Sequence, residues 1–177
     1  MRISAIRSLL CFAAAVTLAS AAHGQEAVHR DGLWLSGGLG IGSMGCRTCS
    51  GRETSLTGEV TVGGALGQMF LIGGGITFWS KTGNGTIALL DFVVRLYASP
   101  RSGLYFALGG GGGLVSSSIS GTGPSGSEFG AGLLIGLGYE IRIARTLAIT
   151  PYWQIFGAKT ETLDVNVGQV GLNITIH

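Results

Sequence analysis

The chain is poor in charged residues, which make up only 11% of the sequence. Soluble domains usually carry about 25%. Hydrophobic residues account for 46%, yet after the N-terminal region no apolar run reaches the 18 or so residues of a membrane-spanning helix. The composition therefore favours a surface that contacts lipid and excludes a transmembrane helix in the body of the chain.

Other scarcities narrow the class of protein further. There are 3 prolines beside 33 glycines, and the glycines have no three-residue period, which excludes a collagen. Arg2 and Arg7 belong to the N-terminal region, and without them the 11 basic residues fall to nine, equal to the 9 acidic ones. The 177 residues carry a formal charge of +2, but the part after the leader is formally neutral, which predicts no nucleic-acid surface. The length predicts one domain.

The first 24 residues have the form of a secretory signal peptide. Two arginines precede an apolar stretch at 9–18, and small residues before the end predict cleavage after Gly24, with Ala21 as the alternative. Cys11 lies inside the apolar stretch and would be removed with it. The apolar stretch is shorter than a spanning helix needs. The leader therefore predicts export.

Residues 25–177 read as one domain of short strands with turn residues between them. Apolar residues alternate with small or polar ones in segments of about ten residues, which is typical of a membrane β-barrel. We expect eight strands, at 32–43, 54–65, 69–80, 86–98, 103–116, 127–141, 146–157 and 163–176. Longer connections alternate with short ones, as in barrels with periplasmic termini. The predicted fold is an all-β, eight-stranded antiparallel up-and-down barrel in the outer membrane of a Gram-negative bacterium.

Four charged residues fall on the face opposite the apolar rows. Glu59, Asp91, Arg95 and Glu140 are expected to point into the barrel, where charges are costly unless they are paired. The prediction is a lumen network of ion pairs and hydrogen bonds. The alternative is a narrow polar channel or a gate, since inward glycines leave room.

The C-terminal segment carries the pattern of a barrel assembly signal. Gln169, Gly171, Ile174 and Ile176 fill its polar, glycine and two hydrophobic positions, while His177 stands where an aromatic residue usually ends the chain. The pattern therefore predicts that the barrel assembly machinery recognises this last strand.

Two irregularities interrupt the strand pattern. The apolar residues at 163–167 alternate in the opposite phase to those that follow, which requires either a bulge near Gly168 or a segment above the bilayer. Pro151 cannot donate to a sheet ladder and marks a bulge in the seventh strand.

The external loops are expected at 44–53 and 117–126, and they offer the surface for an extracellular partner. Cys46 and Cys49 lie in the first loop and predict a local disulfide, because exported cysteines are normally oxidised. A redox site would need a thioredoxin-like context, and zinc would need two more ligands. No metal and no cofactor is expected.

Aromatic residues cluster near the two predicted ends of the strands, which predicts interfacial girdles. The periplasmic group is Trp34, Phe70, Tyr97, Tyr105, Phe106 and Tyr139, and the external group is Phe78, Trp79, Phe129, Trp153 and Phe156.

Across 25–177 the chain resembles the outer membrane protein A-type and opacity-protein-like barrels, on these patterns. The resemblance implies a barrel in the outer-membrane lipid without a family-wide catalytic activity. After the leader the only histidines are His29 and His177, both near periplasmic ends, so no serine–histidine pair is expected. We predict a non-enzymatic barrel with a structural or surface-interaction role. The alternatives are a narrow channel for water, ions or small solutes, and a soluble periplasmic lipocalin-like binder with its apolar rows turned inward.

Overall fold

The computed structural model describes residues 30–47, 51–82, 85–117 and 126–177. The predicted signal peptide lies outside this range. The strands are β1 Leu33–Cys46, β2 Glu53–Ala65, β3 Phe70–Lys81, β4 Gly85–Tyr97, β5 Leu104–Ser117, β6 Gly126–Tyr139, β7 Ile141–Arg142, β8 Leu147–Lys159 and β9 Asp164–Ile176. Because β7 continues β6 after one residue, the nine segments form eight strands, close to the predicted ranges.

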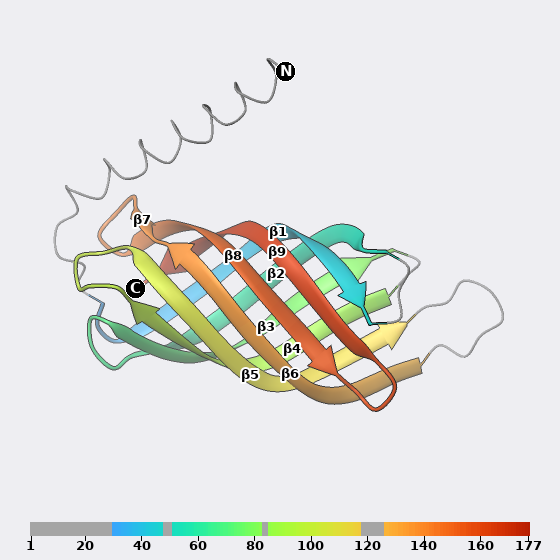
Figure 1. The fold of residues 1–177 in the computed structure, drawn as a ribbon. Coiled ribbons are helices and arrows are strands. Elements are labelled where there is room, and N and C mark those ends of the chain that lie inside the picture. The colour runs from blue at the N-terminus through green and yellow to red at the C-terminus, as the bar shows by residue number, and fades with distance from the viewer. Residues whose placement is uncertain (1–29, 48–50, 83–84, 118–125) are drawn as a thin grey trace, which may run out of the picture.

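The strands close into a barrel (Figure 1). Neighbours in sequence pair antiparallel, and the ring closes where β1 pairs with β9, from Leu35↔Ile176 to Cys46↔Val165. The β6–β7 strand pairs with β8 on the other side. The prediction of an eight-stranded up-and-down barrel is confirmed.

The outer wall of the barrel is apolar, and the lumen holds the polar side chains. Leu90, Phe129 and Leu133 are 64%, 73% and 74% exposed on the outside, whereas Thr57 and Asn173 are fully buried inside. Among the described residues no helix has the length and hydropathy to cross a membrane. The apolar rows point outward, which is the opposite of what a lipocalin-like cup requires.

A bulge near Gly168, which was one of the two alternatives for the change of phase, is absent. Both neighbours of β9 pair with it in one register through this residue, at Ser43↔Gly168 and Ile155↔Gly168. Val165 and Val167 are buried in the lumen, and the alternation of faces continues without a slip. The apparent change of phase therefore reflects a change in polarity, because the lumen is apolar at this end of the barrel.

Pro151 does not mark a bulge either. Pairing along β8 stops at Gly138↔Tyr152 and resumes in the same register at Ile141↔Ile149. No extra residue is inserted, and the ladder is only interrupted opposite the proline, which has no N–H to donate.

The first predicted loop is shorter than expected, because β1 runs to Cys46 and β2 begins at Glu53. The connection is therefore 47–52. The predicted loop at 117–126 loses both end residues to β5 and β6, and its interior lies outside the described residues.

Gly38 allows a close approach in the lumen wall. It pairs with Glu59 on one side and Asn173 on the other. A Cβ at Gly38 would lie 2.1 Å from the side-chain oxygen of Asn173 and 2.2 Å from the backbone oxygen of Leu172. The missing side chain lets Asn173 reach across β1 to the Glu59 carboxylate, to which its amide donates a hydrogen bond.

Replacing Gly38 by alanine should therefore destabilise the barrel by about 2 kcal/mol, because the backbone oxygen cannot move away. Gly37→Ala is the matched control, since a Cβ there meets only ordinary contacts at 3.7 and 3.8 Å. Urea unfolding in lipid vesicles, followed by tryptophan fluorescence, measures both. Equal stability of the two variants would contradict the close-approach argument.

Candidate functional site

A polar network occupies the middle of the lumen around the Glu59 carboxylate of β2. The Glu59 carboxylate accepts hydrogen bonds from the side-chain amides of Asn173 and Gln154, the one from Gln154 at 2.5 Å. Nη2 of Arg95 lies 3.8 Å from the same carboxylate. Strands β2, β4, β8 and β9 each contribute one of these side chains, so the contacts span the lumen and link distant parts of the wall.

Arg95 is also enclosed by aromatic rings. Its guanidinium lies 4.3 Å from the centroid of the Trp34 ring and 5.0 Å from that of Tyr105. Such contacts stabilise a cation that is otherwise desolvated. Arg95 is 2% exposed, so the ion pair and the rings compensate for part of its lost hydration, while its Nη1 has no hydrogen-bond partner among the described residues.

The predicted aromatic girdles are wrong for five residues, which are buried in the lumen. These are Trp34, Trp79, Tyr97, Tyr105 and Phe156, each 3% exposed or less. They lie on the same alternating face of their strands as the polar network, and a side chain on that face cannot reach the bilayer. Phe70, Phe129 and Trp153 are exposed on the outer wall, as a girdle requires.

Asp91 of β4 lies in the same part of the lumen, within electrostatic range of Glu59 and Arg95. It is 5% exposed, and the nearby Thr77 hydroxyl does not meet the usual geometry of a hydrogen bond to its carboxylate, so neither oxygen has a well-formed partner in the described part of the chain. Its paired neighbours are Gly75 and Gly111, which offer no side chain. The central lumen thus holds two carboxylates for one guanidinium.

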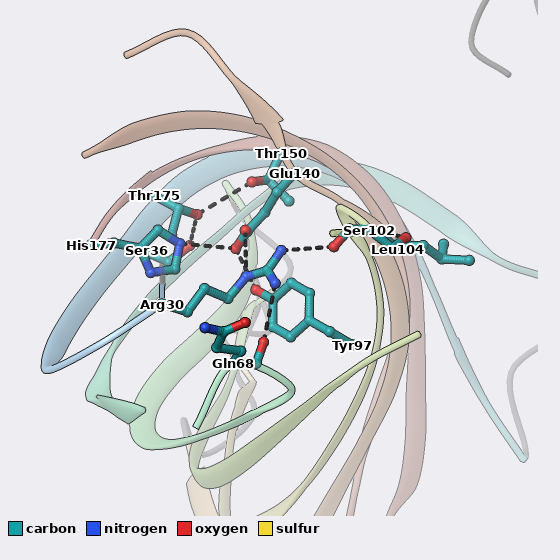
Figure 2. A network of polar contacts seen from close by, with 10 residues as sticks. All are labelled: Arg30, Ser36, Gln68, Tyr97, Ser102, Leu104, Glu140, Thr150, Thr175 and His177. Atoms are coloured by element: carbon teal, nitrogen blue, oxygen red, sulfur yellow. Dashed lines mark hydrogen bonds and ion pairs between the residues drawn. The ribbon is translucent and has the colours of Figure 1, made fainter. Parts of the chain in front are cut away.

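Glu140 belongs to a second cluster, at the end of the barrel where both ends of the described chain meet (Figure 2). Arg30 Nε lies 3.3 Å from one carboxylate oxygen, and His177 Nε2 lies 3.3 Å from the other. The Tyr97 hydroxyl donates to the oxygen that His177 contacts. The contacts with Arg30, His177 and Tyr97 compensate for the burial of the Glu140 carboxylate.

Arg30 precedes the first strand and closes this mouth. Its guanidinium donates to the backbone oxygen of Gln68 at 3.1 Å and to that of Ser102 at 2.8 Å, and it stacks 3.5 Å from the centre of the Tyr97 ring. Gln68 and Ser102 lie in two different turns. One fully buried arginine therefore ties Glu140 to both turns.

The opposite half of the lumen is filled by apolar side chains. They are 7% exposed or less: Trp79, Ile87, Leu89, Val115, Leu134, Phe156, Ala158, Val165 and Val167. A Cβ on Gly132 would come within 2.2 Å of the Leu89 side chain, so Leu89 packs into the space that this glycine leaves. Lumen glycines of this kind make room for neighbouring side chains, and the narrow barrel is packed rather than hollow.

The four predicted lumen residues are all buried inside, but they are not one network. Glu59 and Arg95 form an ion pair, Asp91 makes no hydrogen bond through its carboxylate in the described residues, and Glu140 pairs with Arg30 instead. The alternating pattern alone could have placed Asn173 and Gln154 on this inner face. For Arg30 the sequence has no signal, because it lies before the first strand.

The remaining predicted residues lie at the ends of the barrel or outside the described range. Cys46 ends β1 and is disulfide-bonded, while Cys49 lies outside the described residues. In the described ranges no three His, Cys, Asp or Glu side chains converge on a metal position.

The four residues of the predicted assembly signal lie on β9. Gln169 and Gly171 face the lumen, and Ile174 and Ile176 are 57% and 46% exposed on the outer wall. Recognition of this strand by the assembly machinery stays a prediction.

No family model matches the sequence, and no curated protein matches it either. Solved structures do match the fold. Neisserial surface protein A superposes with a TM-score of 0.60 at 12% identity, covering 81% of this chain and 96% of the other. Ail, the attachment invasion locus protein of Yersinia pestis, superposes with a TM-score of 0.54 at 13% identity, and the match covers 82% of this chain and 99% of Ail. The N-terminal β-barrel domain of Pseudomonas aeruginosa OprF superposes with a TM-score of 0.53 at 11% identity, and the match covers 82% of this chain and 98% of that domain.

The chain therefore has the fold of the small outer-membrane β-barrels. This confirms the class that the sequence resembles. Together with the apolar outer wall, it agrees with the predicted location in the bacterial outer membrane.

Substituting the two central carboxylates should have opposite consequences. Glu59→Gln leaves Arg95 buried without its ion pair and should destabilise the barrel by about 3 kcal/mol. Asp91→Asn removes a buried charge that accepts no hydrogen bond, so its stability should equal or exceed that of the wild type. Urea unfolding in lipid vesicles ranks the two, and a larger loss for Asp91→Asn would contradict the assignment of Glu59 as the centre of the network.

Glu140→Gln should destabilise the barrel by about 3 kcal/mol, because it leaves the fully buried Arg30 without its ion pair. Urea unfolding in lipid vesicles measures the loss. Glu53→Gln is the control, since its ion pair with Lys81 is at the surface and contributes little. A loss no larger than that of Glu53→Gln would contradict this role.

Proposed function

We propose that this chain is a non-enzymatic outer-membrane barrel with a structural or surface-interaction role. The observation that carries the proposal is the filling of the lumen on three levels. The Arg30–Glu140 cluster closes one mouth, the Glu59–Arg95 network fills the middle, and the apolar layer around Leu89 fills the other half.

This packing argues against the narrow channel, which is the main alternative. Conduction needs a continuous polar path, and the apolar layer offers side chains without hydrogen-bonding groups for most of its thickness. The Trp79 indole N–H is turned away to the backbone oxygen of Gly42, at 3.2 Å. Water or ions would have to cross this layer without a partner.

The end of the barrel opposite Arg30 and His177 supports a role at the surface. The short connection 160–163 is braced by Thr160 and Thr162, whose hydroxyls each donate to Glu128 at 2.5 Å. Lys81 pairs with Glu53 at 3.1 Å across neighbouring strands. Strands that are held together up to their ends form a rigid base from which the external connections reach a partner.

Histidine chemistry is not favoured by the geometry. The His177 ring contacts the Glu140 carboxylate in a buried cluster, and no serine donates to it among the described residues. His29 lies outside the described range. This supports the non-enzymatic part of the proposal.

Planar-bilayer recordings test the closed lumen. The wild-type barrel should give no steady conductance, whereas Leu89→Ala together with Phe156→Ala should conduct, because the two truncations open the apolar layer. The double variant must still show a heat-dependent shift in gel mobility, which reports a folded barrel. Steady conductance by the wild type would overturn the proposal in favour of a channel.

Cells that lack the protein separate a structural role from a surface role. Complementation with the wild type and with a variant carrying a glycine–serine replacement of 118–125 is followed by detergent sensitivity and by attachment to host surfaces. A surface role predicts that only attachment is lost with the replacement, and a structural role predicts detergent sensitivity in the deletion that both versions correct. If the deletion changes neither property, the proposal is wrong.

A further inference from the structure

The outer wall changes from apolar to polar over two rows of paired residues, near the end opposite Arg30 and His177. One row of paired residues on the outer wall is apolar and exposed. It consists of Trp153 on β8, Val170 on β9 and Ile41 on β1. The next row toward the external end contains Gly168 on β9 and Ser43 on β1, which are small, while Ile155 on β8 is still apolar and 38% exposed. The apolar wall therefore ends first on β9 and β1. This change marks the level where lipid tails give way to headgroups.

A depression of about 360 Å³ lies at this level, over Gly168. A Cβ at Gly168 would meet nothing within 4 Å, so the depression is open above the backbone. Trp153 and Val170 line its apolar side, and Arg52 lines its external side. Its shape and polarity suit an acyl chain that lies below a charged group.

Arg52 is held in place at the top of the depression. Its guanidinium donates to Ser43 Oγ at 3.1 Å, to the Ser43 backbone oxygen at 2.5 Å and to Asn166 Oδ1 at 2.8 Å. All three acceptors are uncharged, so they fix the guanidinium without neutralising it. An ordered cation at headgroup level is suited to a phosphate.

A second depression of about 490 Å³ adjoins the first, because Asn166, which binds Arg52, also lines it. Leu133 and Ile155 form its apolar side, and Lys159 lies at its external side. Asp164 is paired with Lys159 across the strands and offsets part of its charge, so Arg52 is the stronger anion site. Two cations above two apolar depressions match a lipid with two phosphates and several chains better than a phospholipid with one phosphate.

We propose that this face of β8, β9, β1 and β2 binds a phosphorylated, multiply acylated saccharolipid of the outer leaflet. One phosphate contacts Arg52, and one acyl chain lies over Gly168 against Trp153. A second phosphate lies near Lys159. This inference rests on the proposed placement of the barrel, with the termini on the periplasmic side.

The test uses the full mature chain in nanodiscs and native mass spectrometry to count bound lipid. The probe is a bisphosphorylated, multiply acylated glucosamine disaccharide, and phosphatidylglycerol is the comparison lipid. Arg52→Gln removes the charge, and Gly168→Leu fills the depression without a backbone clash. Arg52→Gln should weaken binding of the saccharolipid by about tenfold or more, the usual effect of losing a charge-assisted hydrogen bond. Gly168→Leu should also weaken it, because the leucine side chain takes the place of the acyl chain. Arg101→Gln is the control and should bind like the wild type, because it removes an exposed cation from the opposite end of the barrel.

Three results would overturn the inference. They are unchanged binding by both Arg52→Gln and Gly168→Leu, an equal loss with Arg101→Gln, and binding of phosphatidylglycerol as tight as that of the saccharolipid. Each variant is first checked for the heat-dependent mobility shift. A wild-type chain without that shift would refute the barrel placement itself, whereas a folded barrel without selective lipid binding would refute only this site.

Discussion

The structure depends on the pairing of β1 with β9, because a sheet in a bilayer cannot leave an edge unpaired. Each free N–H or C=O in the hydrocarbon region would cost several kcal/mol, and closure pairs the two edges that an open sheet would leave free. The ladder from Leu35↔Ile176 to Cys46↔Val165 joins the first and last strands of the chain. The two ends of the described chain are therefore brought together, where Arg30 and His177 contact the same carboxylate. Closure of the barrel makes this contact possible, and the contact in turn stabilises the closed barrel.

Eight strands make a narrow barrel, and this narrowness determines the chemistry inside. Charges in the lumen have little water, so Glu59 needs two amides and a guanidinium, and Arg95 needs two aromatic rings. Glycine provides the space for these contacts. At Gly38 the absent side chain lets a hydrogen bond cross an entire strand, and at Gly132 it lets Leu89 complete the apolar layer. The glycine content that made the sequence unusual is thus used for packing, which supports a closed lumen over a channel.

The outer wall follows from the same period-two alternation, but its two ends differ. Along β9, toward the external end, the lumen side becomes apolar while the outer side becomes polar, as Val167 inside and Asn166 outside illustrate. This inversion explains why the segment before Gly168 looked like a register slip. It also brings Arg52 to a polar level of the wall, next to apolar depressions that face lipid.

The sequence by itself determined the number of strands, their approximate limits and the inward position of Glu59, Asp91, Arg95 and Glu140. It could do so because a half-buried strand repeats every two residues, and that repeat is local. It could not determine which of the four charges pair, that Arg30 joins Glu140, or that Trp34 and Tyr105 enclose Arg95. Those contacts join residues up to about a hundred positions apart, and they depend on strand stagger and on which side chains meet across the lumen. Only the closed tertiary structure decides these, because no local pattern records which strands face each other.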